Sequence, residues 1–440
     1  MMIETTPAQQ PEEDKLKVFR TAGLIGDIML KNGAETYRVE DTVRRVLRTA
    51  GVNDAEAVAT LTGLTISMED PSSAPMTSVR RVDTRISHLG KIEVANEISR
   101  EYVSRRITID EAYERLKELD KNPLRYHWKI VIPVCSLTCG CFCLLFGGTM
   151  RDFAATLLAG LLYGCFTHLT DWIPVNSFLK TMLASFLIGL FTLLFCYGIP
   201  LGEHPDLVIA GCIMPLVPGL SIMNGIQDTL YGDYLSGLAR LIEAFLTALL
   251  IAGGAGLLMQ GLSGSLSYQA VTENVVPWLL DSSKGLLQPY YAVQTAAAFL
   301  SALTFCVIMK ATPKHLLYCG ICGAAVWILY LALPYLGMSK LAAVFLATFL
   351  ICPLASWFAR IRKAPTTIFF TAITINLVPG YGMYKFMFYL IGREYENALV
   401  CGMDTLEIAA LIAAALATHL SIRKILPFFR RNGKKSSTQI

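Results

Sequence analysis

Residues 216–234 read "LVPGLSIMNGIQDTLYGDY", and this stretch decides the fold because a helix-breaking Pro218-Gly219 stands inside a long apolar region. Proline removes a backbone donor and disfavours the helical conformation of the residue before it, and glycine adds conformational freedom. Every backbone group left unpaired in hydrocarbon costs several kcal/mol. The break must therefore face protein or a water-filled cavity.

The composition is that of a membrane protein with a polar N-terminal part. The chain of 440 residues is 54% hydrophobic and has a mean hydropathy of +0.49. Residues 1–128 hold 19 Lys/Arg and 21 Asp/Glu, whereas residues 129–440 hold 19 and 13. The apolar part contains ten runs, each near the ~20 residues that a helix needs to cross a bilayer. These expected spans are 129–149, 152–170, 177–198, 206–226, 234–260, 288–309, 315–336, 340–359, 365–391 and 398–425.

The loops indicate how these spans are oriented. No basic region followed by a short apolar segment opens the sequence, so we expect residues 1–128 to stay on the side of synthesis. With ten alternating spans, the inside loops and C-terminal tail hold twelve Lys and Arg residues, and the outside loops hold Arg151, Lys284, Lys340 and Arg393. This distribution fits the positive-inside rule. It predicts a multi-pass membrane protein with both termini in the cytoplasm.

The opening stretch has a second copy, because residues 377–395 read "LVPGYGMYKFMFYLIGREY". The two LVPG sequences are 161 residues apart. Three inserted residues would then place Arg240 and Glu243 opposite Asp404 and Glu407. This shared order of features indicates an internal duplication. Five spans in each half make the second half enter from the opposite face, so we expect two inverted five-helix repeats, the architecture of many secondary transporters.

Both breaks predict a binding site. The half-helix after each break offers free N–H groups and roughly half a positive charge, which suits a carboxylate. Ser221, Asn224, Asp228 and Tyr231 follow the first break at helical spacing and form one polar face. The alternatives are a plain kink at Pro-Gly and interhelical hydrogen bonds that touch no ligand. The residues expected to bind substrate are Pro218, Gly219, Ser221, Asn224, Asp228, Asn376, Pro379, Gly380, Tyr384 and Lys385.

Four charged residues, Arg240, Glu243, Asp404 and Glu407, fall in or near later apolar spans. Arg240 and Glu243 are one helical turn apart and suit an ion pair. Asp404 and Glu407 have the same spacing, and because two close carboxylates resist joint ionisation, one of them can carry a proton. A charge at the bilayer centre costs about 2.5–3.5 kcal/mol. We therefore expect proton coupling or buried ion pairs here, the structural alternative being a pair between halves such as Arg240 with Glu407.

The polar N-terminal part predicts a small cytoplasmic α/β domain. We expect helices over 14–50 with a break at "KNGAET", strands at 59–68 and 74–86, and helices at 91–104 and 108–120, the last capped by Thr108 or Asp110. Glu35, Arg38, Glu40 and Asp41 cluster on one segment. A solvated helix face or a contact with the membrane is the favoured interpretation of this cluster, and catalysis is the alternative.

The expected domain organisation has five parts. It comprises the cytoplasmic domain at 1–128, a first five-span repeat at 129–262, a linker at 263–286, a second repeat at 287–426 and a basic cytoplasmic tail at 427–440.

No motif for an enzyme, a metal or a cofactor is found. The twelve cysteines lie mostly inside apolar runs, and "CGIC" at 319–322 has no second pair, so they indicate packing. There is no ATP-binding motif, which argues against primary active transport, and the basic residues flank spans and do not indicate nucleic acid. "GLSGS" at 261–265 and His419 superficially resemble serine hydrolase elements, but "GLSGS" lies between expected spans. The expected partners are a small-molecule substrate, protons and the lipid bilayer, with a homo-oligomer left open.

Three segments carry a resemblance to a known family: "KNGAETYRVEDTVRRV" (31–46), "VPGLSIMNGIQDTLYGDYLSGLARLIEA" (217–244) and "NLVPGYGMYKF" (376–386). They resemble the threonine/serine exporter family, the first two its larger N-terminal domain and the third its smaller C-terminal membrane domain, here fused in one chain. The resemblance implies a ten-span inner-membrane secondary exporter of threonine and serine that uses the proton gradient. It also implies a link to two-subunit relatives that export dicarboxylates such as succinate. A hydrolase-like cytoplasmic domain has been described for the family, but the residues here do not establish it.

The sequence therefore predicts a proton-coupled exporter of small hydroxylated amino acids. The alternative in the same class is a dicarboxylate exporter, in which Lys385 and Arg240 bind the second carboxylate. A membrane sensor or scaffold and an intramembrane enzyme are the alternatives from other classes, and the paired breaks favour transport over both.

Overall fold

The computed structural model describes residues 12–51, 54–69, 74–83, 85–122, 126–170, 172–173, 176–262, 289–378 and 380–436. The chain forms two compact units. The first contains residues 1–125 and the segment Tyr231–Ser236, and the second contains residues 126–230 and 237–440. The expected linker at 263–286 lies outside the described residues.

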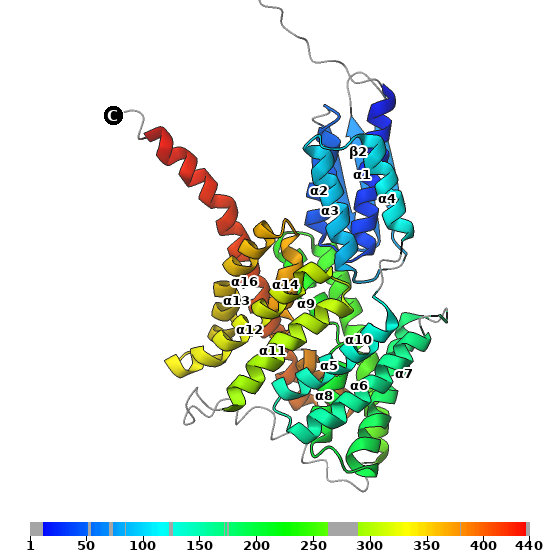
Figure 1. Ribbon diagram of the computed structural model, residues 1–440, viewed down its shortest axis with the longest axis vertical. Coiled ribbons are helices and arrows are strands. Elements are labelled where there is room, and N and C mark those ends of the chain that lie inside the picture. Colours follow the sequence, from blue (N-terminus) through cyan, green and yellow to red (C-terminus); the bar gives the residue numbers. More distant parts are fainter. Residues whose placement is uncertain are drawn as a thin grey trace, which may run out of the picture. The chain divides into compact units, whose positions relative to one another are not determined.

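The first unit is the expected α/β domain. Its elements are α1 (Glu12–Lys31), α2 (Thr36–Arg48), β1 (Asp54–Thr60), β2 (Gly63–Glu69), β3 (Met76–Arg81), α3 (Leu89–Val103) and α4 (Ile109–Lys121). The strands form an antiparallel sheet in the order β1-β2-β3, on which α1 and α2 pack, while α3 and α4 pack on α1 (Figure 1). The single strand predicted at 59–68 is wrong, because the Leu61-Thr62 turn divides it between β1 and β2. Thr108 caps α4, as expected, by accepting from the Glu111 N–H at 3.3 Å.

The charged cluster of the N-terminal domain forms ion pairs along α2 and at its start. Glu35 pairs with Arg38 at 3.0 Å, and Glu40 and Asp41 each pair with an arginine one turn further along α2. Next to this cluster, the Tyr37 ring lies 4.8 Å from the ring of Tyr231 within the first unit. Tyr231 lies in the turn that follows helix α9 (Gly219–Leu230), so its predicted place on the polar face of a helix is wrong.

The second unit has eight described helices that are long and apolar enough to cross a membrane. The chain is thus a multi-pass membrane protein. These helices are α5 (Trp128–Leu145), α6 (Met150–Thr170), α7 (Ser177–Leu193, extended to Gly198 by a π-helical turn), α10 (Tyr234–Leu262), α11 (Pro289–Ile308), α12 (Leu316–Ala332), α13 (Lys340–Ile361) and α16 (Tyr395–Ser436). The last expected span lies within helix α16, which continues beyond it to Ser436.

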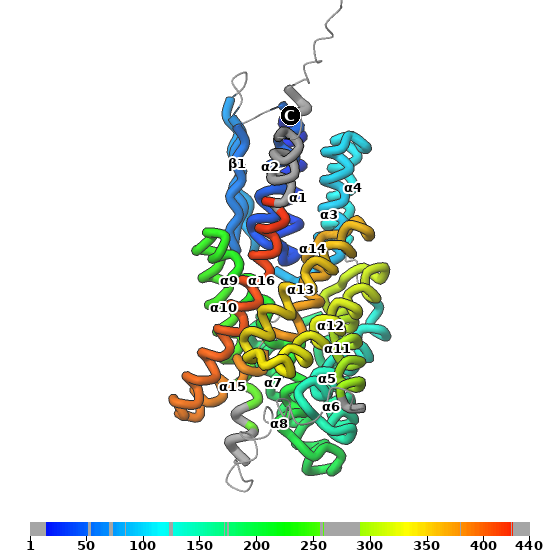
Figure 2. The backbone as a smooth tube through the Cα atoms, turned by 90° about the vertical axis from the view of Figure 1, so that its left-hand side faces the viewer, coloured from blue at the N-terminus to red at the C-terminus, as the bar shows by residue number. Residues whose placement is uncertain are grey.

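The fourth and ninth expected spans are each divided into two short helices. The first is α8 (Pro205–Ile213) followed by α9 (Gly219–Leu230), and the second is α14 (Thr366–Thr374) followed by α15 (Gly380–Ile391). Both interruptions fall on the LVPG sequences, because proline cannot donate within a helix and the residue before it avoids the helical conformation. The predicted helix breaks are confirmed. Helix α9 lies beside α16 (Figure 2).

The two halves repeat the same order of elements at a nearly constant offset. Helices α8, α9 and α10 begin 161 residues before α14, α15 and α16, at 205 and 366, 219 and 380, and 234 and 395. The span Ser177–Gly198 corresponds to Lys340–Ile361 at an offset of 163. Left-handed backbone recurs at the same offsets, at Gly147 and Lys310 and again at Gly232 and Arg393.

This constant offset corrects one detail of the sequence comparison. Because α10 and α16 begin 161 residues apart, the three-residue insertion expected before the charged residues is absent from the described helices. Glu243 therefore corresponds to Asp404, and Arg240 corresponds to Cys401.

Candidate functional site

The two LVPG breaks lie against each other inside the second unit. A Cβ added to Gly219 would lie 2.1 Å from Cγ1 of Val378, and a Cβ added to Gly380 would lie 2.9 Å from Cγ1 of Val217. Each glycine thus accommodates the valine of the other break, which no residue with a side chain could do without displacement. The structure brings together the two predicted breaks, although Pro379 itself lies outside the described residues.

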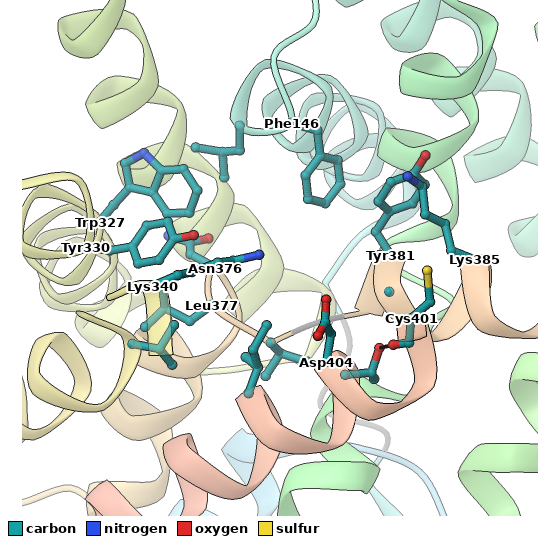
Figure 3. Close-up of a pocket in the computed structure, with 16 residues that line it drawn as sticks. Phe146, Trp327, Tyr330, Lys340, Asn376, Leu377, Tyr381, Lys385, Cys401 and Asp404 are labelled. Carbon is teal, nitrogen blue, oxygen red and sulfur yellow. Dashed lines mark hydrogen bonds between the residues drawn. The ribbon is translucent and has the colours of Figure 1, made fainter. Parts of the chain in front are cut away.

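A cavity of about 250 Å³ opens beside the second break (Figure 3). Its wall combines the ends of α5 and α12, the start of α13, the start of α15 and the first third of α16. The lining residues are Leu145, Phe146, Trp327, Tyr330, Lys340, Val344, Asn376, Leu377, Val378, Tyr381, Gly382, Lys385, Cys401, Asp404, Thr405 and Ile408. The residues of the first break are not part of this cavity lining. They pack against the second break through Gly219 and Val217.

Three charged side chains face the cavity. In Figure 3 the Asp404 carboxylate rises from α16 between Lys340 on one side and Lys385 on the other. The Lys385 Nζ lies 5.0 Å from the centre of the Tyr381 ring. The cavity therefore offers binding partners for both carboxylates and ammonium groups.

Asn376 lines the cavity, but its amide is already engaged. Its Nδ2 donates to the carbonyls of Ala298 at 2.9 Å and Gly323 at 3.3 Å, and its Oδ1 accepts from the Ser301 hydroxyl at 2.8 Å. These bonds tie the second break to α11 and α12. Asn376 was expected to bind substrate, and in the structure its amide holds the second break in place through these hydrogen bonds.

Arg240 forms an ion pair with Asp228, a partner that the sequence analysis did not consider. Its Nε lies 2.8 Å from Oδ2 of Asp228, and both side chains are buried. This ion pair joins α9 to α10. The turn after α9 brings Asp228 back onto α10. Asp228, expected to bind substrate, lies outside the cavity lining.

The remaining predicted residues also lie outside the cavity lining. Ser221 and Asn224 are half-buried on α9, as is Glu243 on α10. Tyr384 is buried, with its ring 6.1 Å from that of Tyr381. Glu407 is exposed, one turn beyond Asp404. Of the residues expected to bind substrate that the structure describes, Asn376 and Lys385 line the cavity, and of the four charged residues, Asp404 does.

Sequence reasoning missed Lys340 and the aromatic wall formed by Trp327 and Tyr330. Lys340 was counted only as one of the few basic residues of the outside loops. Its position as the first residue of an apolar helix gave a signal, because a cation there lies at the membrane boundary. The two aromatic residues gave no such signal in the sequence, because aromatic residues are common in apolar runs.

Comparisons with known proteins cover nearly the whole chain. A family model for threonine/serine exporters matches residues 20–261, and a second, described as "Threonine/Serine exporter, ThrE", matches residues 294–422. The chain is 23% identical over 418 residues to the "Probable threonine/serine exporter" of Mycobacterium tuberculosis, covering 93% of this chain and 76% of that one. It is 22% identical over 416 residues to the "Threonine/serine exporter" of Corynebacterium glutamicum, covering 91% and 80%.

A third relative matches only the first part of the chain. The "Probable succinate transporter subunit YjjP" of Klebsiella aerogenes is 26% identical over 243 residues, which cover 54% of this chain and 91% of the relative. No solved structure matches the chain.

Proposed function

The chain belongs to the threonine/serine exporter family, a family of membrane exporters and not of enzymes, and on this premise we propose that it is a secondary exporter of threonine and serine. We place the protein in a bacterial inner membrane and take the proton gradient as its energy source. The observation that carries the proposal is the cavity beside the paired breaks, in which Asp404 stands between Lys340 and Lys385 (Figure 3).

Asp404 is the residue that couples substrate to protons. An ionised carboxylate binds the ammonium group of an amino acid by a charge-assisted hydrogen bond, and a protonated one does not. A proton and the substrate therefore compete for the same group. This competition makes the exporter an antiporter, because a proton entering from outside displaces the amino acid and takes its place on Asp404.

Alternating access follows from the duplication. We propose that the two halves are inverted repeats that rock against each other around the paired breaks, with both termini in the cytoplasm. The equal lengths of α8 and α14, and of α9 and α15, support a shared origin of the halves. The close contact of Gly219 with Val378 supports a pivot at the breaks. The two breaks pack too tightly to move independently of each other, so they form the fixed point around which the halves rock.

A dicarboxylate exporter is the second candidate, favoured by the two ammonium groups of the cavity. Of the two cations expected to bind the second carboxylate, Lys385 lines the cavity, whereas Arg240 is paired with Asp228; Lys340 is the second cation of the cavity lining. In this case Asp404 would have to be protonated while the dicarboxylate is bound. The relative named as a succinate transporter subunit gives this candidate its substrate class.

Transport by the purified full-length protein in liposomes tests the proposal. Labelled threonine, serine and succinate are each offered under an imposed pH gradient. We expect threonine and serine flux that follows the gradient, and Asp404→Asn should abolish that coupling. Glu407→Gln is the matched control, since it removes an acid one turn away on α16 that does not line the cavity.

The outcomes separate the candidates. Succinate flux without threonine or serine flux would replace the first candidate with the second. No flux of any of the three would refute both. Threonine flux that stays coupled to the gradient in Asp404→Asn would move proton coupling to another acid, with Glu243→Gln as the next variant.

A further inference from the structure

We infer that the hydroxyl of Tyr330 recognises the side-chain hydroxyl of threonine and serine, which makes Tyr330 a specificity-determining residue of the cavity. This inference rests on the exporter function proposed above and extends it from the charged ends of the amino acid to its side chain. Tyr330 thereby decides between substrates of equal charge and nearly equal size, such as threonine and valine, which the charged groups of the cavity cannot tell apart.

Size and charge alone do not separate threonine from valine. The two amino acids carry the same charged ends and differ only in a hydroxyl that takes the place of a methyl group. Much of the cavity wall is apolar and includes Phe146, Val344 and Ile408. A buried hydroxyl without a hydrogen-bond partner is costly, so this wall by itself would favour valine. A preference for the hydroxylated substrate therefore requires a polar group that is left over for its side chain.

Most polar groups of the cavity lining are already committed. The Asn376 amide makes the three hydrogen bonds described above. The Thr405 hydroxyl donates to the carbonyl of Cys401 at 2.6 Å, and the Cys401 thiol is a weak donor. The Trp327 Nε1 is buried and is not exposed at the cavity surface. The three charged side chains suit the two charged ends of an amino acid. None of these groups is left over for the substrate hydroxyl.

Tyr330 supplies the missing partner. Its side chain is half-buried, and its hydroxyl points into the cavity beside Asn376 (Figure 3). The Tyr381 hydroxyl instead points away from Asp404. Within the described part of the chain, no hydrogen bond engages the Tyr330 hydroxyl. Because tyrosine hydroxyls inside proteins usually have a hydrogen-bond partner, this one suits a ligand. A phenol both donates and accepts, so it can pair with an aliphatic hydroxyl in either direction.

Packing fixes the direction of this hydroxyl. Trp327 precedes Tyr330 by about one turn of α12, and the two ring centres lie 5.3 Å apart at an interplanar angle of 44°. Trp327 is 5% exposed, so the ring against which Tyr330 packs is itself held in place. A hydroxyl that is held before the substrate arrives loses less conformational freedom on binding. Trp327 is therefore a positioning residue for Tyr330.

The first experiment measures recognition of the hydroxyl in liposomes that contain the full-length protein. Unlabelled threonine and valine each compete with labelled serine, and the ratio of their inhibition constants, valine over threonine, is the readout. Tyr330→Phe removes one oxygen atom and keeps the ring. We expect it to lower the ratio about tenfold, because the substrate hydroxyl then stays buried without its partner. Tyr318→Phe should leave the ratio unchanged, since Tyr318 lies on the same helix outside the cavity lining.

The same ratio separates recognition of the hydroxyl from other roles of Tyr330. If Tyr330 donated to the substrate carboxylate, Tyr330→Phe would weaken threonine and valine by the same factor. A purely structural role would lower the maximal rate and leave the ratio as it is in the wild type. Either result would overturn the inference. Trp327→Phe keeps the hydroxyl but loosens its support, so its ratio should fall between those of the wild type and Tyr330→Phe.

A third measurement needs only the wild-type protein, so it holds even where a variant fails to fold. Valine and alanine are each compared with the hydroxylated amino acid of the same size or chain length, threonine and serine. We expect the hydroxylated member of each pair to compete with labelled threonine about tenfold more strongly. Competition by valine as strong as that by unlabelled threonine would show that no group in the cavity recognises the hydroxyl, and the inference would be wrong.

The failures of the inference and of the proposed function are distinguishable. If the wild type moves neither threonine nor serine, the proposed function fails. If the wild type moves both and prefers threonine to valine, but Tyr330→Phe keeps that preference, the exporter stands and the role of Tyr330 is wrong.

Discussion

Breaking the ion pair between Arg240 and Asp228 should strongly destabilise the membrane unit. The pair joins α9 to α10 at 2.8 Å, and the two residues are 6% and 1% exposed. Removing one partner of a buried pair leaves an uncompensated charge and costs about 3–5 kcal/mol. We therefore expect Arg240→Met to lower the free energy of unfolding by that amount. The double variant Arg240→Met/Asp228→Leu should recover most of the loss, because apolar residues of similar volume often replace such a pair without cost.

The matched control is the exposed pair between Arg151 and Glu203 in the same unit. It has a similar distance of 2.7 Å, but its side chains are 61% and 42% exposed. Arg151→Met should cost less than about 1 kcal/mol, since solvent screens exposed pairs. The assay is reversible unfolding of the purified protein in mixed micelles, followed by circular dichroism as denaturing detergent is added. Equal losses in Arg240→Met and Arg151→Met, or a double variant less stable than either single variant at the buried pair, would refute the reasoning.

Three further predictions concern the break, a strained turn and the N-terminal unit. Gly219→Ala should cost about 1–3 kcal/mol and slow threonine flux, because its Cβ would overlap Val378, whereas Gly253→Ala, with nothing within 4 Å, should be neutral or stabilising in the same unfolding assay. Arg393→Gly should stabilise the protein by about 1–2 kcal/mol, since Arg393 has a φ of 62°; a loss of stability would contradict this. Burial raises the pKa of the Tyr37 phenol to about 12, although the positive charge of the neighbouring Arg38 acts in the opposite direction and lowers this pKa. The stability from keeping this phenol neutral is present below pH ~10 and is lost as the pH rises to about 12. Absorbance titration at 295 nm should therefore lose one late-ionising tyrosine in Tyr37→Phe, and an unchanged titration would contradict the assignment.

The cavity lining contains some of the residues that the sequence predicted for the site and not others. Lys385 and Asp404 were predicted because a charge within an apolar run is energetically costly, and both line the cavity. Ser221 and Asn224 were expected at the site by the same polarity argument, but they lie on α9, outside the cavity lining. The two breaks are not equivalent in the folded chain, since only the second lines the cavity. The repeat predicted a symmetry that the side chains do not keep: Lys385 stands where the first half has Asn224.

The sequence by itself determined the membrane class, the small N-terminal α/β domain, the two helix breaks and the duplication. These properties depend on local chemistry: apolar length sets a span, proline and glycine interrupt a helix, and a repeated order of residues marks a repeat. Only the tertiary structure decided which side chains meet. Three contacts join segments that are distant along the chain or that turn back on themselves. They are the pairing of Arg240 with Asp228, the contact of the two breaks and the place of Lys340 beside Asp404. Such contacts depend on how whole helices pack against one another. The spacing of residues within one segment does not determine that packing.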